Sequence, residues 1–214
     1  MNKLIKDIDN ALATYPTLKK VTEGVFIRVK GEIPLIHPEK GEFDQYKVLI
    51  KFTKNYPKCF PKVIETSEKI PRKDFRHVNH DNTLCFAVEP EEQVICKNGI
   101  TFKFFLDKVL VPHLARETYR ESKGFYPDGE YEHGYNGIWQ YYESILDKKD
   151  KQSIIIELEQ VVNSTWPKRN DKCSCGSGKK FKKCHHSKWL KVLKTGKPYL
   201  QNQIQILKYN INNE

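Results

Sequence analysis

The sequence lacks any run of about 18 apolar residues, the length that a membrane-spanning helix requires. Its first residues, from Met1 to Asp7, also lack the apolar core of a signal peptide. Internal repeats and long low-complexity tracts are absent as well. Hydrophobic residues make up 38% of the chain and charged residues 30%, typical of a polar globular protein. We therefore expect a cytoplasmic protein without a membrane partner.

The 214 residues suffice for one well-buried domain and an appendage. Their net charge of +10 is concentrated near the C-terminus. From Lys151 onward there are 13 Lys and Arg residues against four Asp and Glu residues, whereas the preceding residues carry 24 against 23. Such a positive field favours binding of acidic proteins, nucleic acid or nucleotide phosphates. A solvated lysine-rich face without a partner is an equally good interpretation.

The six cysteines divide into a scattered group and a clustered group. In a cytosolic chain, such cysteines more often bind metal or catalyse a reaction than form disulfides. The scattered ones are Cys59, Cys85 and Cys96, and the clustered ones are Cys173, Cys175 and Cys184. This division predicts two kinds of chemistry.

The clustered cysteines form the most specific motif in the chain. Two cysteines one residue apart, a turn containing Gly176 and Gly178, and a Cys-His pair supply four ligands for tetrahedral Zn²⁺. His186 competes with His185 for the last position. The segment resembles the SEC-C motif first described at the C-terminus of the SecA translocation ATPase. This resemblance implies a structural Zn²⁺ as cofactor, with the ligands Cys173, Cys175, Cys184 and His185.

The hydrophobic pattern before this motif predicts a helix, a sheet and further helices. We expect a helix over residues 2–13, strands over 21–29, 46–52 and 62–66, and a helix over 100–114. Residues 31–45 are expected to form either a strand-poor connection or a loose hairpin between the strands, and residues 86–99 an irregular acidic segment. Helices are expected over residues 138–162, with a break near 148–150. The aromatic segment 125–142 is either a cap on the core or a groove for a partner peptide.

A proline-braced turn and a cysteine with polar neighbours stand out between Tyr56 and Cys85. A free cysteine has a pKa of about 8.5, so a catalytic one needs groups that stabilise its thiolate. The candidates are His77, Asn79, His80 and Asp81. The competing interpretation makes Cys85 a small buried hydrophobic residue. Cys59 and Cys96 lack such neighbours. We expect Cys59 to be buried inside the turn, and Cys96, in a loop, to be either inert or a second thiol near the site.

These residues resemble a stretch of the ubiquitin-conjugating enzymes. Tyr56-Pro57 followed by Pro61-Lys62-Val63 is similar to their Tyr-Pro-x-x-x-Pro-x-Val segment, and His77, Asn79 and Leu84-Cys85 match their His-Pro-Asn and Leu-Cys motifs. Val78 replaces the proline, and the short spacing to the cysteine points to the bacterial branch. The resemblance implies an α+β fold with an N-terminal helix, an antiparallel meander, an active-site loop and C-terminal helices. It predicts a catalytic domain over residues 1–165, followed from Trp166-Pro167 by the zinc knuckle and basic tail over 166–214.

The resemblance also implies acyl transfer through a thioester at Cys85. The donor would be a protein with a C-terminal glycine, such as the cGAS-like nucleotidyltransferase of antiphage (CBASS) operons, and an activating enzyme is a further possible partner. Asn79 would stabilise the oxyanion, His80 or Asp81 would take the amine proton, and His77 would brace the loop. If no activating enzyme exists, His77 or His80 would pair with Cys85 as the base.

Two other functions fit parts of the sequence. A catalytically silent adaptor of the same fold would bind proteins through its groove and knuckle. A zinc-knuckle nucleic-acid binder would use the basic C-terminal region, but the knuckle offers few of the stacking aromatics that such binders use. We therefore do not expect a nucleic-acid partner.

Overall fold

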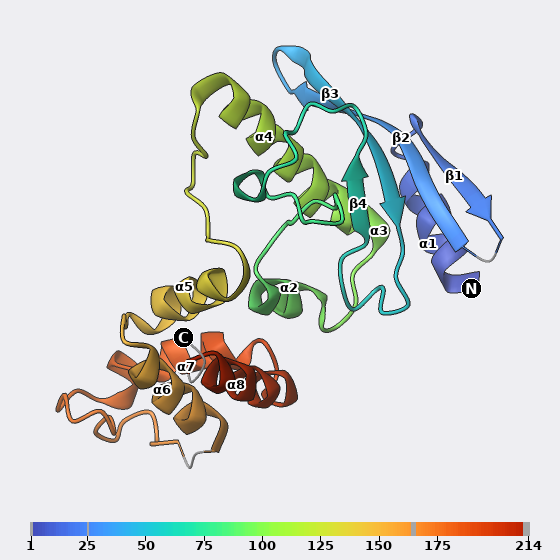
Figure 1. The fold of residues 1–214 in the computed structure, drawn as a ribbon. Coiled ribbons are helices and arrows are strands. Elements are labelled where there is room, and N and C mark those ends of the chain that lie inside the picture. The colour runs from blue at the N-terminus through green and yellow to red at the C-terminus, as the bar shows by residue number, and fades with distance from the viewer. Residues whose placement is uncertain (1, 25, 164–165, 212–214) are drawn as a thin grey trace. The chain divides into compact units, whose positions relative to one another are not determined.

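The computed structural model describes residues 2–24, 26–163 and 166–211, which form two compact units. The first unit comprises Met1–Ala87 and Asn98–His133, and the second comprises Val88–Lys97 and Gly134–Glu214. Both are drawn in Figure 1. No helix among the described residues has the length and apolar character needed to cross a membrane.

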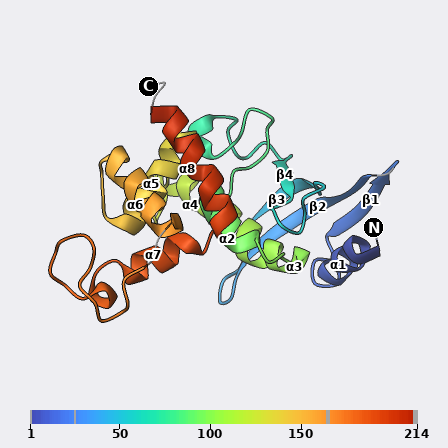
Figure 2. The same ribbon diagram turned by 90° about the horizontal axis from the view of Figure 1, so that it is seen from below.

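The first unit is built on a four-stranded antiparallel sheet with the order β1-β2-β3-β4. Its helices α1 and α4 contact β1 and β2, and Figure 2 shows α1 and α3 on the same side of the sheet. The elements in chain order are α1 (Asn2–Leu12), β1 (Leu18–Glu23), β2 (Phe26–His37), β3 (Gly41–Lys51), β4 (Lys62–Glu65), η1 (Asp74–Arg76), α3 (Phe102–Phe105), the π-helical turn η2 (Leu106–Leu110) and α4 (Val111–Lys123). The α+β class is thereby confirmed.

One face of the sheet is buried, as the alternating pattern predicts. Tyr46, Val48 and Ile50 on β3 are buried, and Val29 and Ile33 on β2 join them. The helices add Ile8, Ala11, Phe102, Phe105, Leu106, Leu110 and Leu114 to the buried residues. A sheet covered by helices on this face supplies a rigid support for the loop that follows β4.

Of the two predictions for residues 31–45, the hairpin is confirmed, since β2 and β3 pair antiparallel there, and the strand-poor connection was wrong. β2 continues to His37, and β3 already begins at Gly41. Pro34 is tolerated because β1 pairs with β2 only as far as Gly31, so the following part of β2 is hydrogen-bonded on one side alone. Gly31 itself has a φ of 150°, and a Cβ there would lie 2.1 Å from the Thr17 carbonyl oxygen.

The second unit is helical. Its elements are α2 (Glu89–Cys96), α5 (Gly134–Leu146), α6 (Lys151–Asn163), η3 (Phe181–Lys183), α7 (His186–Leu193) and α8 (Lys197–Ile211). Helices α7 and α8 pack on α6, α7 also contacts α5, and α2 contacts α5. The predicted break near residues 148–150 is confirmed, since α5 and α6 are separated there.

The prediction of an irregular segment over residues 86–99 was wrong, because α2 lies within it. Pro90 in the first turn and the carboxylates of Glu89, Glu91 and Glu92 favour a helix N-terminus. Cys96 consequently lies on a helix and is fully buried, not in a loop.

The predicted domains, 1–165 and 166–214, differ from the two compact units. Helices α5 and α6 precede the predicted boundary but belong to the second unit, together with the knuckle. Residues 164–165 lie outside the described ranges. Whether the chain folds as those two predicted domains stays a prediction.

Candidate functional site

A tight loop after β4 brings His77 and Cys85 together. Val78 and Leu84 form an antiparallel bridge, and the Cys85 amide donates to the His77 carbonyl oxygen at 2.7 Å. The Leu84 amide donates to the carbonyl oxygen of Val63 on β4 at 2.8 Å, which ties this hairpin-like loop to the sheet. Residues eight apart in sequence therefore face each other across one strand pair.

A third residue, His133, completes a cluster with these two. One side-chain atom from each of His77, Cys85 and His133 lies within 4.8 Å of the others, and all three side chains are partly buried. The imidazole rings of His77 and His133 have centroids 4.8 Å apart. A thiol beside two imidazoles is the arrangement that activates a cysteine nucleophile, and the same groups can also bind a transition metal.

Glu130 contacts the His77 ring. Its carboxylate Oε2 lies 2.9 Å from His77 Nε2, and Arg120 lies 3.4 Å from the same carboxylate. Burial lowers the pKa of His77, the neighbouring His133 lowers it further, and Glu130 opposes both effects.

A buried ion pair anchors the loop to α4. Arg76 donates to Glu117 at 2.8 Å and also pairs with Glu121. The Tyr126 hydroxyl donates to the other oxygen of Glu117, and burial beside this carboxylate raises the pKa of Tyr126 to about 12. Glu117 is fully buried, so these partners are required to compensate its charge.

His113 of α4 lies on another side of the His77 ring, with centroids 6.5 Å apart. Its ring also packs edge-on against Phe86 at 5.0 Å. Burial lowers the pKa of His113 to about 3, so the ring is neutral at physiological pH. The neutral His113 ring therefore borders the cluster without adding charge to it.

The other predicted catalytic residues lie in the turn of the loop. The Asn79 side chain donates to Thr83 Oγ1 at 3.1 Å, and His80 is exposed. Asp81 accepts from Thr83 and from Lys62, and the Lys62 contact lowers the pKa of Asp81 to about 2. The cluster of His77, Cys85 and His133 does not include these three, and their catalytic roles stay predictions.

Sequence reasoning missed His133, Glu130 and His113. His133 lies 48 positions after Cys85, in the aromatic segment whose structure the pattern left open. No motif connects these residues with the loop: His113 lies on α4, and the packing of residues 124–133 on α4 brings Glu130 and His133 there. The Cys59 thiol, by contrast, lies within 3.1 Å of Thr53 Oγ1 in the proline-braced turn.

The second cluster consists of the four expected metal ligands. His185 Nδ1 lies 3.2 Å from the sulfurs of Cys173 and Cys184, and the sulfurs of Cys175 and Cys184 are 3.6 Å apart. Ligand atoms about 2.0–2.3 Å from a tetrahedral Zn²⁺ would be separated by roughly 3.3–3.8 Å. These four residues could therefore hold such an ion with small adjustments.

The backbone of the knuckle brings the two halves of the motif together. The Cys173 amide donates to the Lys179 carbonyl oxygen at 2.8 Å, beside an isolated bridge between Lys172 and Lys180. Gly176 and Gly178 take positive φ values of 77° and 71° in the intervening turn, as the motif requires. Burial raises the pKa of Cys173, whereas the hydrogen bond to Ser177 lowers that of Cys175 to about 6.

Residues outside the motif support it. His185 Nε2 lies 3.4 Å from Glu157 Oε1 on α6, and the Trp189 indole donates to the same oxygen at 2.8 Å. A carboxylate behind a ligating histidine fixes the ring and raises its basicity. His186 does not contribute to the cluster, since its ring packs against Trp166 and Phe181.

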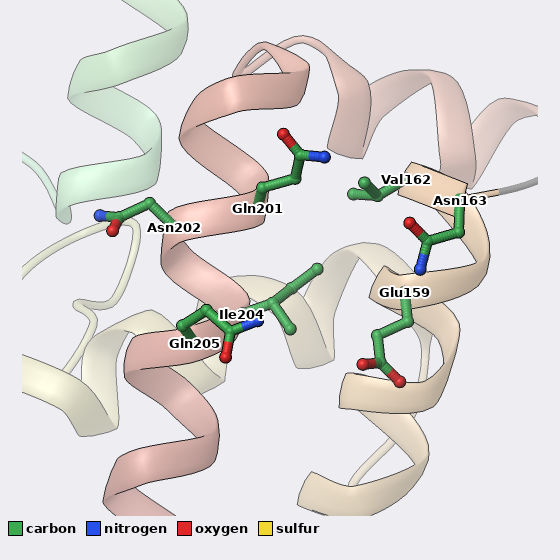
Figure 3. A pocket seen from close by; sticks show the side chains of 7 residues that line it. All are labelled: Glu159, Val162, Asn163, Gln201, Asn202, Ile204 and Gln205. Carbon is green, nitrogen blue, oxygen red and sulfur yellow. The ribbon is translucent and has the colours of Figure 1, made fainter.

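A pocket of about 350 Å³ lies between α6 and α8. Figure 3 shows Glu159 and Asn163 on one helix and Gln201, Ile204 and Gln205 on the other. Among the described residues that line it, Glu159 alone is titratable, and Lys208 pairs with it at 2.6 Å. The side chains of these described residues suit hydrogen bonding.

Comparison with known proteins identifies the knuckle as an SEC-C motif, matched over residues 169–187. The chain is similar to UPF0225 proteins of Vibrio parahaemolyticus and Vibrio vulnificus, each 43% identical over 49 residues. It is also similar to protein translocase subunit SecA of Ehrlichia canis, with 42% identity over 56 residues.

These similarities are local. They cover 23% of this chain, 29% of the UPF0225 proteins and 6% of SecA. The SEC-C match lies outside residues 1–165, so the resemblance to ubiquitin-conjugating enzymes and the link to antiphage operons stay predictions.

Proposed function

We propose that the protein is a ubiquitin-conjugating-like cysteine acyltransferase with Cys85 as its nucleophile. The observation that carries this proposal is the position of the Cys85 thiol beside the imidazoles of His77 and His133. A neighbouring imidazole can take the thiol proton and leave the thiolate that attacks a carbonyl group. Cys59 lacks such a cluster in the described part of the chain.

The order of elements supports the finer fold assignment. The elements follow the order expected for a ubiquitin-conjugating fold: a helix, a four-stranded antiparallel meander, a long loop that contains the cysteine, and a further helix. The loop from residue 66 to residue 87 contains only the short η1, and long loops of this kind are commonly functional.

The proposed reaction is transfer of an acyl group from a protein C-terminus to an amine. The Cys85 thiolate attacks the activated carbonyl carbon of a C-terminal glycine, the sulfur–carbon bond forms and the activating group leaves. The amine then attacks the thioester carbon, the nitrogen–carbon bond forms and the carbon–sulfur bond breaks. A base takes the amine proton, and the thiolate is regenerated. From the resemblance, the donor we propose is a cGAS-like nucleotidyltransferase, and its conjugation would prime antiviral signalling.

We further infer that the SEC-C cluster binds a structural Zn²⁺ in the second unit. Four protein ligands close the coordination sphere, and closed sites of this kind stabilise a fold and leave no position for a substrate. Phe181, at the start of η3, is fully buried against Trp166 and Trp189, so the knuckle is anchored to the helices around it.

The proposal is tested by co-expressing the protein with its genomic neighbours and measuring intact mass without reductant. We expect an adduct that thiols release, that persists in Cys59→Ser and that disappears in Cys85→Ala. If no adduct forms and Cys85→Ala functions normally in cells, the proposal fails and the silent adaptor becomes the better explanation.

Measuring the metal content distinguishes two interpretations of the His77, Cys85 and His133 cluster, a cysteine nucleophile and a second metal site. We expect one zinc per chain, unchanged in Cys85→Ala. Two metal ions per chain, one of them lost in Cys85→Ala, would assign His77, Cys85 and His133 to metal binding and contradict the proposed chemistry.

A further inference from the structure

The segment between α4 and α5 contributes two residues to the Cys85 site. Residues 124–133 are fixed on α4, because Arg116 donates to the Gly129 carbonyl oxygen at 2.8 Å and Arg120 stacks on the Tyr126 ring at 4.3 Å. This attachment places Glu130 against His77, and His133 beside both His77 and Cys85. The two imidazoles of the cluster are therefore held in different ways.

His77 has one ring nitrogen already engaged. Its Nε2 contacts Glu130, so Nδ1 is the nitrogen that remains for exchange with the thiol. A carboxylate on one imidazole nitrogen fixes the tautomer and stabilises the imidazolium that forms when the ring takes a proton. Glu130 is thus suited to orient His77 and to support a thiolate–imidazolium pair with Cys85.

His133 has a ring nitrogen with no such partner. Its Nε2 is buried and has no hydrogen-bond partner among the described residues. Buried polar atoms are nearly always paired in a folded protein, and an unpaired one at a candidate site points to a missing ligand. An amine that approaches the Cys85 thioester would bring an N–H group to this region.

We propose that the two histidines divide the reaction: His77, positioned by Glu130, holds the Cys85 proton, and His133 takes the proton of the attacking amine. This inference rests on the proposed function and adds its acceptor chemistry. Because a lysine ammonium has a pKa of about 10.4, little free amine is present at neutral pH, and a base beside the thioester that takes the amine proton accelerates the attack.

A small ester makes both steps measurable without the natural donor. With p-nitrophenyl acetate, the Cys85 sulfur bonds to the acetyl carbon, the ester carbon–oxygen bond breaks and nitrophenolate leaves, while His77 holds the thiol proton. Nα-acetyl-lysine amide then attacks the acetyl thioester, the carbon–sulfur bond breaks, and His133 receives the amine proton and releases it to solvent.

The experiment compares acylation and aminolysis in the full-length protein. In His133→Gln, we expect acylation within about twofold of wild type and aminolysis slower by roughly 10²-fold, the scale of general base catalysis. In His133→Ala, added imidazole should restore part of the aminolysis. His37→Gln, an exposed histidine on β2, serves as the matched control.

The Glu130→Gln variant tests the positioning role through its pH profile. Loss of the carboxylate should move the acylation profile to higher pH by about one unit, because it removes an opposite charge beside the imidazolium. The other ionisable and charged groups around His77, namely His133, His113, Arg116, Arg120, Glu117 and Tyr126, remain in place. Glu42→Gln, exposed on β3, is the control.

The outcomes separate this inference from the proposed function. If Cys85→Ala reacts with the ester as wild type does, the nucleophile itself is wrong. If Cys85 is acylated but His133→Gln is aminolysed at the wild-type rate, only the role of His133 is overturned. Equal losses of both steps in His133→Gln, or an unshifted profile in Glu130→Gln, would overturn the division between the histidines.

Discussion

The knuckle and the Cys85 site assemble in opposite ways. All four ligand residues of the knuckle lie within 13 positions, and local turns bring their side chains together. The Cys85 site combines one short loop with residues more than 25 positions away, on α4 and on the segment after it. A local motif can be recognised from sequence alone. For a site made by tertiary packing, the sequence reveals only the residues that lie close together along the chain.

The largest effect is expected from breaking the knuckle. Cys184→Ser removes one thiolate, and metal binding in isolated zinc-finger peptides is worth roughly 10–16 kcal/mol. We expect zinc to fall from one ion per chain to none and the second unit to lose thermal stability, while Cys85 keeps its reactivity. Ser187→Ala, exposed on α7, should leave both unchanged. Full zinc content in Cys184→Ser would contradict the ligand assignment.

The corresponding change for the Cys85 site is Arg76→Met. It leaves the buried Glu117 carboxylate without its main cationic partner, which costs about 3–5 kcal/mol in comparable buried pairs. Urea unfolding should show this loss, and Cys85 alkylation should change while zinc content does not. Arg28→Met breaks an exposed pair with Glu23 and should cost less than about 1 kcal/mol. Similar losses in the two variants would argue against a buried anchor.

A smaller effect on zinc binding is expected from changing Glu157, which contacts the ligand His185. Glu157→Gln weakens the support of His185, and losing such a partner typically lowers metal affinity 10–100-fold. Competition with a chromogenic chelator measures this affinity. Glu159→Gln, on the same helix, is the control. Equal zinc affinities in the wild type, Glu157→Gln and Glu159→Gln would mean that the motif alone determines zinc binding.

The smallest effect concerns the pH dependence of stability. Because the folded state holds the pKa of His113 near 3, below the unfolded value of about 6.5, only the unfolded chain binds this proton between those values. Stability is therefore fully present above pH 6.5 and is lost as pH falls. Linkage gives a loss of about 1 kcal/mol between pH 6.5 and 5.5.

Urea unfolding at the two pH values checks this expectation. His113→Gln should remove most of the difference, and His37→Gln should keep it. A slope that survives in His113→Gln would assign it to other groups, among them His77, whose pKa is also lowered.

Individual elements show which parts of the molecule could be predicted from the sequence. Alternation along β3 predicted its buried face, and the SEC-C spacing predicted a cluster that the structure contains. The strand through Pro34 stayed one of two alternatives, because a proline is tolerated there only if β1 ends before it, and the local pattern does not show where β1 ends. His133 was missed for the same reason, since its place beside Cys85 depends on contacts of Tyr126 and Gly129 with α4.

The most direct test of the central claim compares Cys85 with Cys59 in one protein. Iodoacetamide reacts with the thiolate, so an ordinary thiol with a pKa of about 8.5 is alkylated slowly at pH 6. We expect rapid alkylation of Cys85 at this pH, slow alkylation of Cys59, and loss of the difference in His77→Gln. Equal rates at both cysteines over pH 6 to 9, unchanged in His77→Gln, would contradict an activated nucleophile at Cys85.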